Sequence, residues 1–318
     1  MPQPSFSEVH VDRPLTSISV AFLQNGQYVA PQVFPIIRTS KASDSFFTYD
    51  RDYWFRSGQV LQRAPGTESA GSGYTISTST YNTVRIAIHK DVDDPTRDNA
   101  DEPLDLNREA AEFTAMQIAI DIERRWAGDF FTTSVWNADT TPGTLWDVAT
   151  SDPISDIEAR ALVMMENTGL RPNTLVLGAQ TWSDGLKNHP DLLDRIKYTQ
   201  RGIVTADLLA AALDLQRVLV ATATSNTATE GATGSYDFIA GQNDALLLYT
   251  PPNPGRLTPA AGYTFVWTGA AGADNEMGVR TKRFRMEEIE SERIETETWF
   301  DHVRIAQVLG EFFSNVAT

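Results

Sequence analysis

The segment FFTYDRDYWF, residues 46–55, places six aromatic and three charged residues within ten positions. Aromatic side chains bury roughly 150 to 250 Å² each when packed, so the segment carries on the order of 1,000 Å² of apolar surface. The chain then reads APGTESAGSG over residues 64–73 and cannot cover these rings locally. The rings therefore need another surface, on the same chain or on a second one. They are Phe46, Phe47, Tyr49, Tyr53, Trp54 and Phe55.

Residues 39–90 have the pattern of a long β-hairpin. The aromatic segment forms the outgoing arm, and Pro65, Gly66, Gly71 and Gly73 form the tip. The returning segment YTISTSTYNTVRIAIHKDV is rich in β-branched residues, and Val84, Ile86 and Ile88 alternate along one face. An ordinary hairpin that packs only on its own domain is the alternative, and it stays open at this point.

Residues 1–38 are predicted to form an extended arm. Pro2, Pro4, Pro14, Pro31 and Pro35 separate short apolar groups such as ISVAFL, which leaves room for one short helix. The N-terminus lacks the basic region and apolar core of a signal peptide, and no window approaches eighteen consecutive apolar residues. We expect neither secretion by a signal peptide nor insertion into a membrane.

An acidic segment, DVDDPTRDNADEPLDL, begins at residue 91 and superficially resembles a calcium-binding loop. Pro95 follows Asp94, the turn glycine is missing, and no glutamate stands at the closing position that such a loop requires. We therefore expect a solvated loop that caps helices, and no metal site.

The longest predicted helix spans about residues 104–131. Apolar residues repeat along it at helical spacing in two stripes, so the helix is expected to be apolar on two faces. The first stripe is Ala110, Phe113, Met116 and Ile120, and the second is Ala111, Ala115, Ile118, Ile122 and Trp126.

A change of pattern at residue 152 predicts an α/β unit. Asp152 and Pro153 provide an N-cap and a first-turn proline, and Gly169 is placed to end the helix. The strand TLVLG, residues 174–178, follows, and further helices and strands alternate through RVLVATA and DALLLYT to YTFVWTG near residue 268. The insertion ATSNTATEGATGSY is predicted to be an exposed loop. The charged, alternating segment from Val279 to Phe313 suits long strands with a solvated face.

Composition excludes several classes of protein. The 318-residue chain has 42 acidic and 26 basic residues, a net charge of −16, which is the wrong sign for a protein that grips nucleic-acid phosphates. It has no cysteine, which excludes disulfides, thiolate metal sites and a cysteine nucleophile and is compatible with folding in a reducing cytoplasm.

No catalytic motif accompanies the α/β unit. The sequence has no phosphate-binding loop, dinucleotide-binding glycine pattern, nucleophile elbow or HExxH pair. His189 lies at the start of a predicted helix, where a structural role is expected, and Ser183, His189 and Asp191 are too close in sequence for a convincing triad. We expect no enzymatic activity, no cofactor and no metal. An α/β hydrolase or transferase stays the alternative from a different class.

The order of these parts resembles the major capsid protein of tailed bacteriophages, whose α+β fold is shared with encapsulin shells and the herpesvirus capsid floor. Two stretches carry the resemblance. One is DVDDPTRDNADEPLDLNREAAEFTAMQIAIDIERRWAGDFF, which resembles the start and length of the family's spine helix, with Glu123 near its end. The other is ENTGLRPNTLVLGAQTWSDGLKNHPDLLDRIKYTQRG, which resembles the start of the family's axial domain.

The resemblance implies a division of the whole chain. It consists of an N-terminal arm at 1–38, an extended hairpin loop at 39–90, a peripheral domain at 91–151 with the spine helix, an axial domain at 152–261, and return strands of the peripheral domain at 262–318. In the family, the extended loop lies over the adjacent subunit and the axial domains meet in pentamers and hexamers. The six rings at residues 46–55 would then be subunit-interface residues.

The implied function is the shell of a phage head that is assembled in the bacterial cytoplasm and encloses double-stranded DNA without sequence-specific binding. The implied partners are many copies of the chain, with portal, scaffolding and decoration proteins. An encapsulin-like compartment that holds protein cargo is the alternative within the same fold.

Two departures from relatives qualify the resemblance. No lysine lies between Lys41 and Lys90, so a covalent lysine–asparagine crosslink from the loop is not expected. The arm begins almost at Met1, so we expect any scaffolding function to come from another protein or from a segment already removed. The basic residues Arg280, Lys282, Arg283, Arg285, Arg124 and Arg125 are expected to pair with Glu287, Glu288 and acids of neighbouring subunits rather than with DNA.

Overall fold

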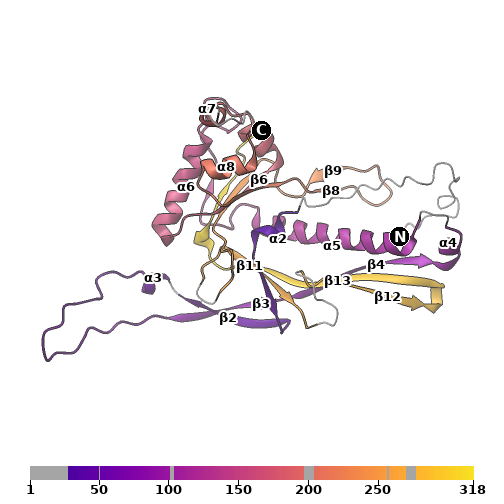
Figure 1. Ribbon diagram of the computed structural model, residues 1–318, viewed down its shortest axis with the longest axis horizontal. Helices are drawn as coiled ribbons and strands as arrows, with labels where there is room; N and C mark the ends of the chain where they lie inside the picture. Colours follow the sequence, from indigo (N-terminus) through magenta and orange to yellow (C-terminus); the bar gives the residue numbers. More distant parts are fainter. Residues whose placement is uncertain (1–27, 50, 101–103, 197–203, 256–257, 270–276) are drawn as a thin grey trace.

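The computed structural model describes residues 28–49, 51–100, 104–196, 204–255, 258–269 and 277–318. Most of the predicted arm lies outside these residues. The described chain contains two five-stranded sheets and two separate two-stranded ribbons. One sheet carries the long helix, the other carries the α/β helices, and one ribbon extends away from both sheets (Figure 1).

The first sheet is built around β13 (Ser291–Arg304). On one side β13 pairs with β4 (Val84–Asp93). Along its other side, residues 291–297 of β13 pair with β12 (Arg280–Met286), and residues 300–304 pair with β11 (Gly262–Trp267). The edge strand β1 (Ile36–Thr39) runs parallel to β11. A short 3-10 turn, Glu287–Ile289, connects β12 to β13. All partners of β13 except β12 lie far from it in sequence.

Helix α5 (Leu106–Phe130) packs against β13 and β4. Its buried face repeats every fourth residue, and the hydroxyl groups of Thr114 and Thr296 lie 2.8 Å apart between the helix and β13. The prediction of two apolar faces was wrong, because the structure buries one continuous face of the helix. Phe113, whose ring lies 5.5 Å from the Lys90 ammonium of β4, stays 43% exposed at the margin of that face. The buried residues are Leu106, Ala110, Thr114, Ile118, Ile122, Glu123, Trp126, Ala127 and Phe130.

The second sheet has the order β5 (Asp139–Thr140), β14 (Gly310–Phe313), β10 (Ala245–Leu248), β6 (Thr174–Gly178) and β7 (Arg217–Ala221). Its helices are α6 (Pro153–Thr168), the π-helical turn Thr181–Leu186, α7 (Pro190–Ile196) and α8 (Ala206–Ala212). The ends of α6 follow the sequence prediction.

Both caps of α6 are local. The Asp152 side chain accepts a hydrogen bond from the backbone N–H of Ser155 at 3.0 Å, and Gly169 closes the helix in the left-handed conformation with φ 72°.

Two strands near the C-terminus lie in different sheets. The sequence pattern assigned YTFVWTG to the α/β unit, whereas the resemblance placed residues from 262 onward with the return strands; the segment forms β11 in the first sheet. The last strand, β14, leaves the first sheet and pairs with β10, so the return segment 262–318 contributes to both sheets.

The predicted loop insertion contains a small ribbon, β8 (Thr224–Asn226) with β9 (Tyr236–Phe238). A short 3-10 turn, Gln307–Leu309, precedes β14.

The predicted hairpin is shorter than residues 39–90. Its arms are β2 (Ser43–Tyr49) and β3 (Ile76–Asn82), and a single helical turn, α3 (Arg51–Trp54), follows β2. The returning segment divides at Thr83, after which Val84, Ile86 and Ile88 belong to β4 in the first sheet. The segment divides because β4 pairs with β13, about 200 residues away in sequence. A partner at that distance could not be predicted from the local sequence.

The acidic segment caps helices and forms ion pairs. Asp93 caps α4 (Asp94–Asp98), and Asp105 caps α5. Asp91 accepts two hydrogen bonds from Arg293 at 2.7 and 2.8 Å, and Asp94 contacts Arg285 at 2.5 Å. The segment is thus less solvated than predicted. Among the described residues no group of His, Asp or Glu could hold a metal ion.

The described chain begins in a fixed segment around α2 (Ala30–Val33). The buried Glu123 carboxylate accepts the backbone N–H groups of Val29 and Ala30 at 3.1 and 2.8 Å. Phe34 lies fully buried among the rings of Trp126, Phe130, Trp136 and His302. Nowhere in the described ranges is a helix both long and apolar enough to cross a membrane.

Candidate subunit interface

The hairpin is fastened to the first sheet at its base. Tyr81 of β3 and Phe46 of β2 stack on Phe265 of β11, with ring centroids 4.5 and 5.5 Å apart. Asp301 of β13 accepts the backbone N–H of Asn82 at 2.8 Å. Phe46, one of the predicted interface rings, is therefore half-buried on its own chain and anchors the hairpin.

A second attachment lies farther along the hairpin. The Arg51 guanidinium donates to the backbone carbonyl of Asn167 at 2.8 Å, next to the C-terminal end of α6. A cation at this end of a helix is favoured because the last carbonyl groups lack partners within the helix. This contact connects the hairpin to the unit that contains the second sheet.

Beyond Arg51 the aromatic side chains pack mainly on one another. Tyr49 lies 6.0 Å from Trp54 and 6.3 Å from Tyr74, and Trp54 lies 5.4 Å from Tyr74, measured between ring centroids. The Arg56 guanidinium lies 5.1 Å above the ring of Tyr53. This cluster gives local order to the part of the hairpin beyond its base, residues 47–49 and 51–76, here called the outer hairpin, but leaves much of its ring surface in solvent.

The exposed rings make up a large apolar area. Phe47, Trp54, Phe55 and Tyr74 are 65, 54, 62 and 57% exposed, which amounts to roughly 500 Å² of ring surface. A typical monomer's largest apolar patch is about 300 to 600 Å². Tyr53 is exposed as well, and Tyr49 is half-buried in the cluster. Of the six predicted interface rings, the structure thus leaves four exposed: Phe47, Tyr53, Trp54 and Phe55.

Sequence reasoning missed four more exposed apolar residues on the same element. Val60 and Leu61 are isolated in a polar segment, and Tyr74 and Ile76 lie on the returning arm. Val60 is 97% exposed. The signal available in the sequence was this pair of apolar residues in a polar segment between Gly58 and Gly66.

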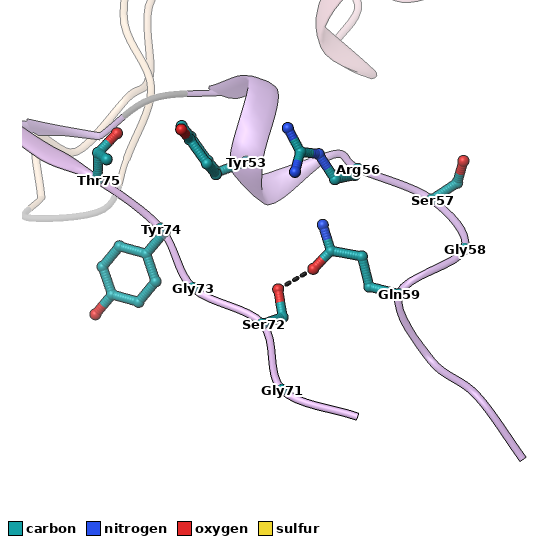
Figure 2. A pocket seen from close by; sticks show the side chains of 10 residues that line it. All are labelled: Tyr53, Arg56, Ser57, Gly58, Gln59, Gly71, Ser72, Gly73, Tyr74 and Thr75. Atoms are coloured by element: carbon teal, nitrogen blue, oxygen red, sulfur yellow. Dashed lines mark hydrogen bonds between the residues drawn. The ribbon is translucent and has the colours of Figure 1, made fainter. Parts of the chain in front are cut away.

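A shallow hollow lies between the two arms of the outer hairpin (Figure 2). Ser72 hydrogen bonds to the side-chain carbonyl of Gln59 across it, while Tyr53 and Arg56 line one arm and Tyr74 the other. Its lining contains no carboxylate and no histidine. This hollow gives the hydrolase alternative no support.

The basic residues of β12 are neutralised within the chain. The Glu297 carboxylate is fully buried, and it accepts hydrogen bonds from Arg85 and Arg280 at 2.7 Å each and contacts Lys282. Burial alone would raise the pKa of Glu297, but these three cations hold it below its ordinary value. Arg283 pairs with Glu292.

The other expected ion pairs are also mostly local. Arg285 reaches Glu287 at 3.6 Å in addition to Asp94, whereas Arg124 and Arg125 both pair with Asp121 on α5. Arg280, Lys282 and Arg283 of β12 thus pair with acids on the adjacent strand β13, whereas Arg285 pairs with Asp94 and with the expected Glu287. This ladder stiffens the first sheet.

His189 has the structural role that was expected. Its Nε2 lies 3.1 Å from the hydroxyl oxygen of Ser151, and its Nδ1 accepts weakly from the backbone N–H of Asp191 at 3.4 Å at the start of α7. Ser183 instead bonds to Asp184. The three residues Ser183, His189 and Asp191 do not form a triad.

Comparison with known proteins finds a relative in sequence and several similar structures. No protein-family model matches the chain. The major capsid protein of Burkholderia phage BcepMu is 42% identical over 72 residues, which is 23% of this chain and 23% of that protein. A phage-related protein from Bordetella bronchiseptica RB50 superposes over 92% of this chain and 93% of its own, with a TM-score of 0.68 and 20% identity.

The capsid protein of cyanophage P-SCSP1u superposes over 98% of both chains, with a TM-score of 0.59 and 12% identity. The chain has the fold of phage major capsid proteins. This capsid fold extends to the SrpI encapsulin of Synechococcus elongatus PCC 7942, with a TM-score of 0.54 and 10% identity over 99% of this chain and 96% of that chain. Within the capsid fold, the exposed rings belong to an element that projects from the body of the subunit (Figure 1).

Proposed function

We propose that this chain is the major capsid protein of a tailed bacteriophage, which assembles into the closed head shell and encloses the double-stranded DNA genome. The observation that carries the proposal is the hairpin, which extends from a subunit of capsid fold and exposes apolar rings that the described residues of its own chain do not cover. Such an element is stable in water when a second surface buries it.

The proposed interface is the outer hairpin of one copy on the body of the next. Phe47, Tyr53, Trp54 and Phe55 supply the contact together with Tyr74, while Phe46 and Tyr49 orient the hairpin from within the parent subunit. Burying roughly 500 Å² of ring surface is worth about 12 kcal/mol of gross free energy, before the cost of ordering the hairpin. Repeated in head-to-tail fashion, such contacts close into rings where the rotation between neighbouring copies closes.

In the assembled shell we assign residues 152–261, which contain the helices and the strands β6, β7 and β10 of the second sheet, to the axial position around pentamers and hexamers. Residues 91–151 and most of 262–318 form the peripheral position, with 1–38 as the arm and 39–90 as the extended loop. Portal, scaffolding and decoration proteins are the proposed partners. The product is a virion component, assembled in the cytoplasm of the host bacterium.

The proposed relation to DNA is confinement rather than tight binding. The cations of β12 and of α5 are paired with acids of the same chain, and the net charge is −16. The duplex would be held inside by the closed wall.

The encapsulin-like alternative shares the fold, and its enclosed cargo would be protein. The head shell is favoured because the relative that matches at the level of sequence is a phage major capsid protein. Electron microscopy of the purified chain tests the assembly, and extraction of nuclease-treated particles from phage-producing cells tests the contents. Closed particles that protect duplex DNA support the proposal; closed particles that hold an enzyme favour the compartment, and a monomer at high concentration contradicts both.

A further inference from the structure

The outer edge of β3 carries backbone groups that no described residue satisfies. Thr83 donates its N–H to Ala42 at 2.8 Å, and these two residues continue the β2–β3 register, so they form a hydrogen-bonded pair. Bonded and non-bonded pairs alternate along antiparallel strands. It follows that Ser77, Ser79 and Tyr81 point their N–H groups toward β2, whereas Ile76, Thr78, Thr80 and Asn82 point theirs away.

One contact supports this assignment independently. The N–H of Asn82 leaves the ribbon and meets the Asp301 carboxylate at 2.8 Å. The body covers the edge only at this base, and within the described ranges the outward N–H and C=O groups of Thr78 and Thr80 have no hydrogen-bond partner.

The edge also lacks the charges that keep exposed strands apart. Natural proteins guard open edges with lysine, other charged residues, proline or bulges. Among the described strands of seven or more residues, β3, with the sequence ISTSTYN, is the one without any Asp, Glu, Lys, Arg or His. The edge strand β12, by contrast, contains Arg280, Lys282, Arg283 and Arg285. The absence of such guarding residues from β3 indicates that its outer edge is meant to pair with another strand.

The face that continues from this edge is apolar at its outer end and polar toward Thr80 and Asn82. Residues whose N–H groups point outward share one face of the ribbon, where Phe47 lies opposite Thr78 and Tyr49 opposite Ile76. Phe47 and Ile76 are at least half exposed. An added strand would therefore gain both main-chain hydrogen bonds and side-chain contacts, as in recognition by strand addition.

We propose that the outer edge of β3 pairs with an extended segment from a second copy of this chain, which converts the two-stranded ribbon into a three-stranded sheet across the subunit boundary. The proposal rests on the proposed self-assembly and gives its contact a main-chain component. A second copy is the occupant because the hairpin extends away from its own body and is too small to be independently stable as two strands (Figure 1).

Residue-resolved hydrogen exchange tests the pairing in the unmodified chain. Thr78 and Thr80 amides should exchange at least about tenfold more slowly in assembled particles than in dissociated subunits, because each gains an acceptor. Ser77 and Ser79 amides, which already face β2, should change less. Particles that form while Thr78 and Thr80 exchange at the subunit rate would overturn the pairing and leave the proposed function intact; a chain that never assembles would overturn both.

A pair of variants separates main-chain pairing from simple burial of the face. Thr78→Pro removes an outward N–H without removing a bond to β2, whereas Thr78→Val keeps the N–H and the β-branched shape. The proline variant should need about tenfold higher concentration to assemble, and the valine variant should assemble like the parent chain. Protection of Ser77 and Ser79 in the dissociated proline variant verifies that the ribbon is intact, and equal assembly of the two variants would overturn the proposal.

Discussion

The ring of Tyr81 lies parallel to the ring of Phe265, with centroids 4.5 Å apart and planes inclined by 7°. Tyr81 belongs to the hairpin and Phe265 to the first sheet, and Phe46 stacks against the same Phe265 ring. This three-ring stack sets where the hairpin leaves the body.

Phe265→Ala should lower the free energy of unfolding by about 3 kcal/mol, because it removes a buried ring with two stacked partners. Chemical denaturation of dissociated subunits measures it. Phe284→Ala on the same sheet is the matched control, since Phe284 is 40% exposed and should cost less than about 1 kcal/mol. Equal losses would mean that the stack does not anchor the hairpin.

Glu123→Gln should destabilise the subunit by about 1 to 2 kcal/mol and speed the exchange of the Ala30 amide. The glutamine nitrogen would face one of the two N–H donors that the carboxylate now accepts. Glu112→Gln, on the exposed side of the same helix, breaks only an ion pair with Arg108 and should change stability by less than about 0.5 kcal/mol. An unchanged Ala30 exchange rate would argue against the cap.

His302 should make the subunit sensitive to acid. Burial of its ring beside Phe34, Phe130 and Phe300, with a smaller effect of Arg125, lowers its pKa from 6.5 to about 4. Between these two pH values His302 is protonated in the unfolded chain but neutral in the folded chain. The free energy of unfolding therefore falls as the pH drops through this range.

The loss from His302 should reach about 3 kcal/mol at pH 4 relative to pH 7. His302→Asn, which keeps a polar atom near the Thr264 hydroxyl that now lies 2.9 Å from Nδ1, should remove this component. The measurement is the free energy of unfolding at both pH values for both proteins. Identical pH profiles would mean that His302 does not titrate as its burial predicts.

Dissociated subunits should bind duplex DNA weakly at physiological salt. The cations of β12 face Glu297, Glu295 and Glu292, so few are free to release counterions from phosphates. A titration at several salt concentrations checks this. Submicromolar affinity with a steep salt dependence would reveal a basic surface and replace confinement with direct binding.

Local signals predicted helices and their ends well where the determinants are adjacent in sequence. Asp152, Pro153 and Gly169 define α6 from their own chemistry, and TLVLG forms β6 over the predicted residues. The aromatic composition of residues 46–55 indicated rings that the segment cannot cover by itself, although it could not show that Phe46 would pack on Phe265.

Long-range pairing explains the errors and omissions. The division of the returning segment at Thr83 depends on β13, and the role of Glu123 depends on backbone groups more than 90 residues away. The cations of β12 were expected to pair with Glu287, Glu288 and acids of neighbouring subunits. Arg285 does reach Glu287, but the antiparallel register places Arg280 opposite Glu297 and Lys282 opposite Glu295. Periodicity shows which residues are apolar but not which strand lies opposite.

The most direct test of the central claim compares the parent chain with Trp54→Ala/Phe55→Ala by sedimentation velocity and by chemical denaturation of dissociated subunits. Both rings are more than half exposed, so the double variant should unfold within about 1 kcal/mol of the parent. It should nevertheless stay dissociated at concentrations where the parent forms closed shells. If the variant assembles as well as the parent, or if assembly and subunit stability fall together, the outer hairpin does not hold the shell together in the way proposed.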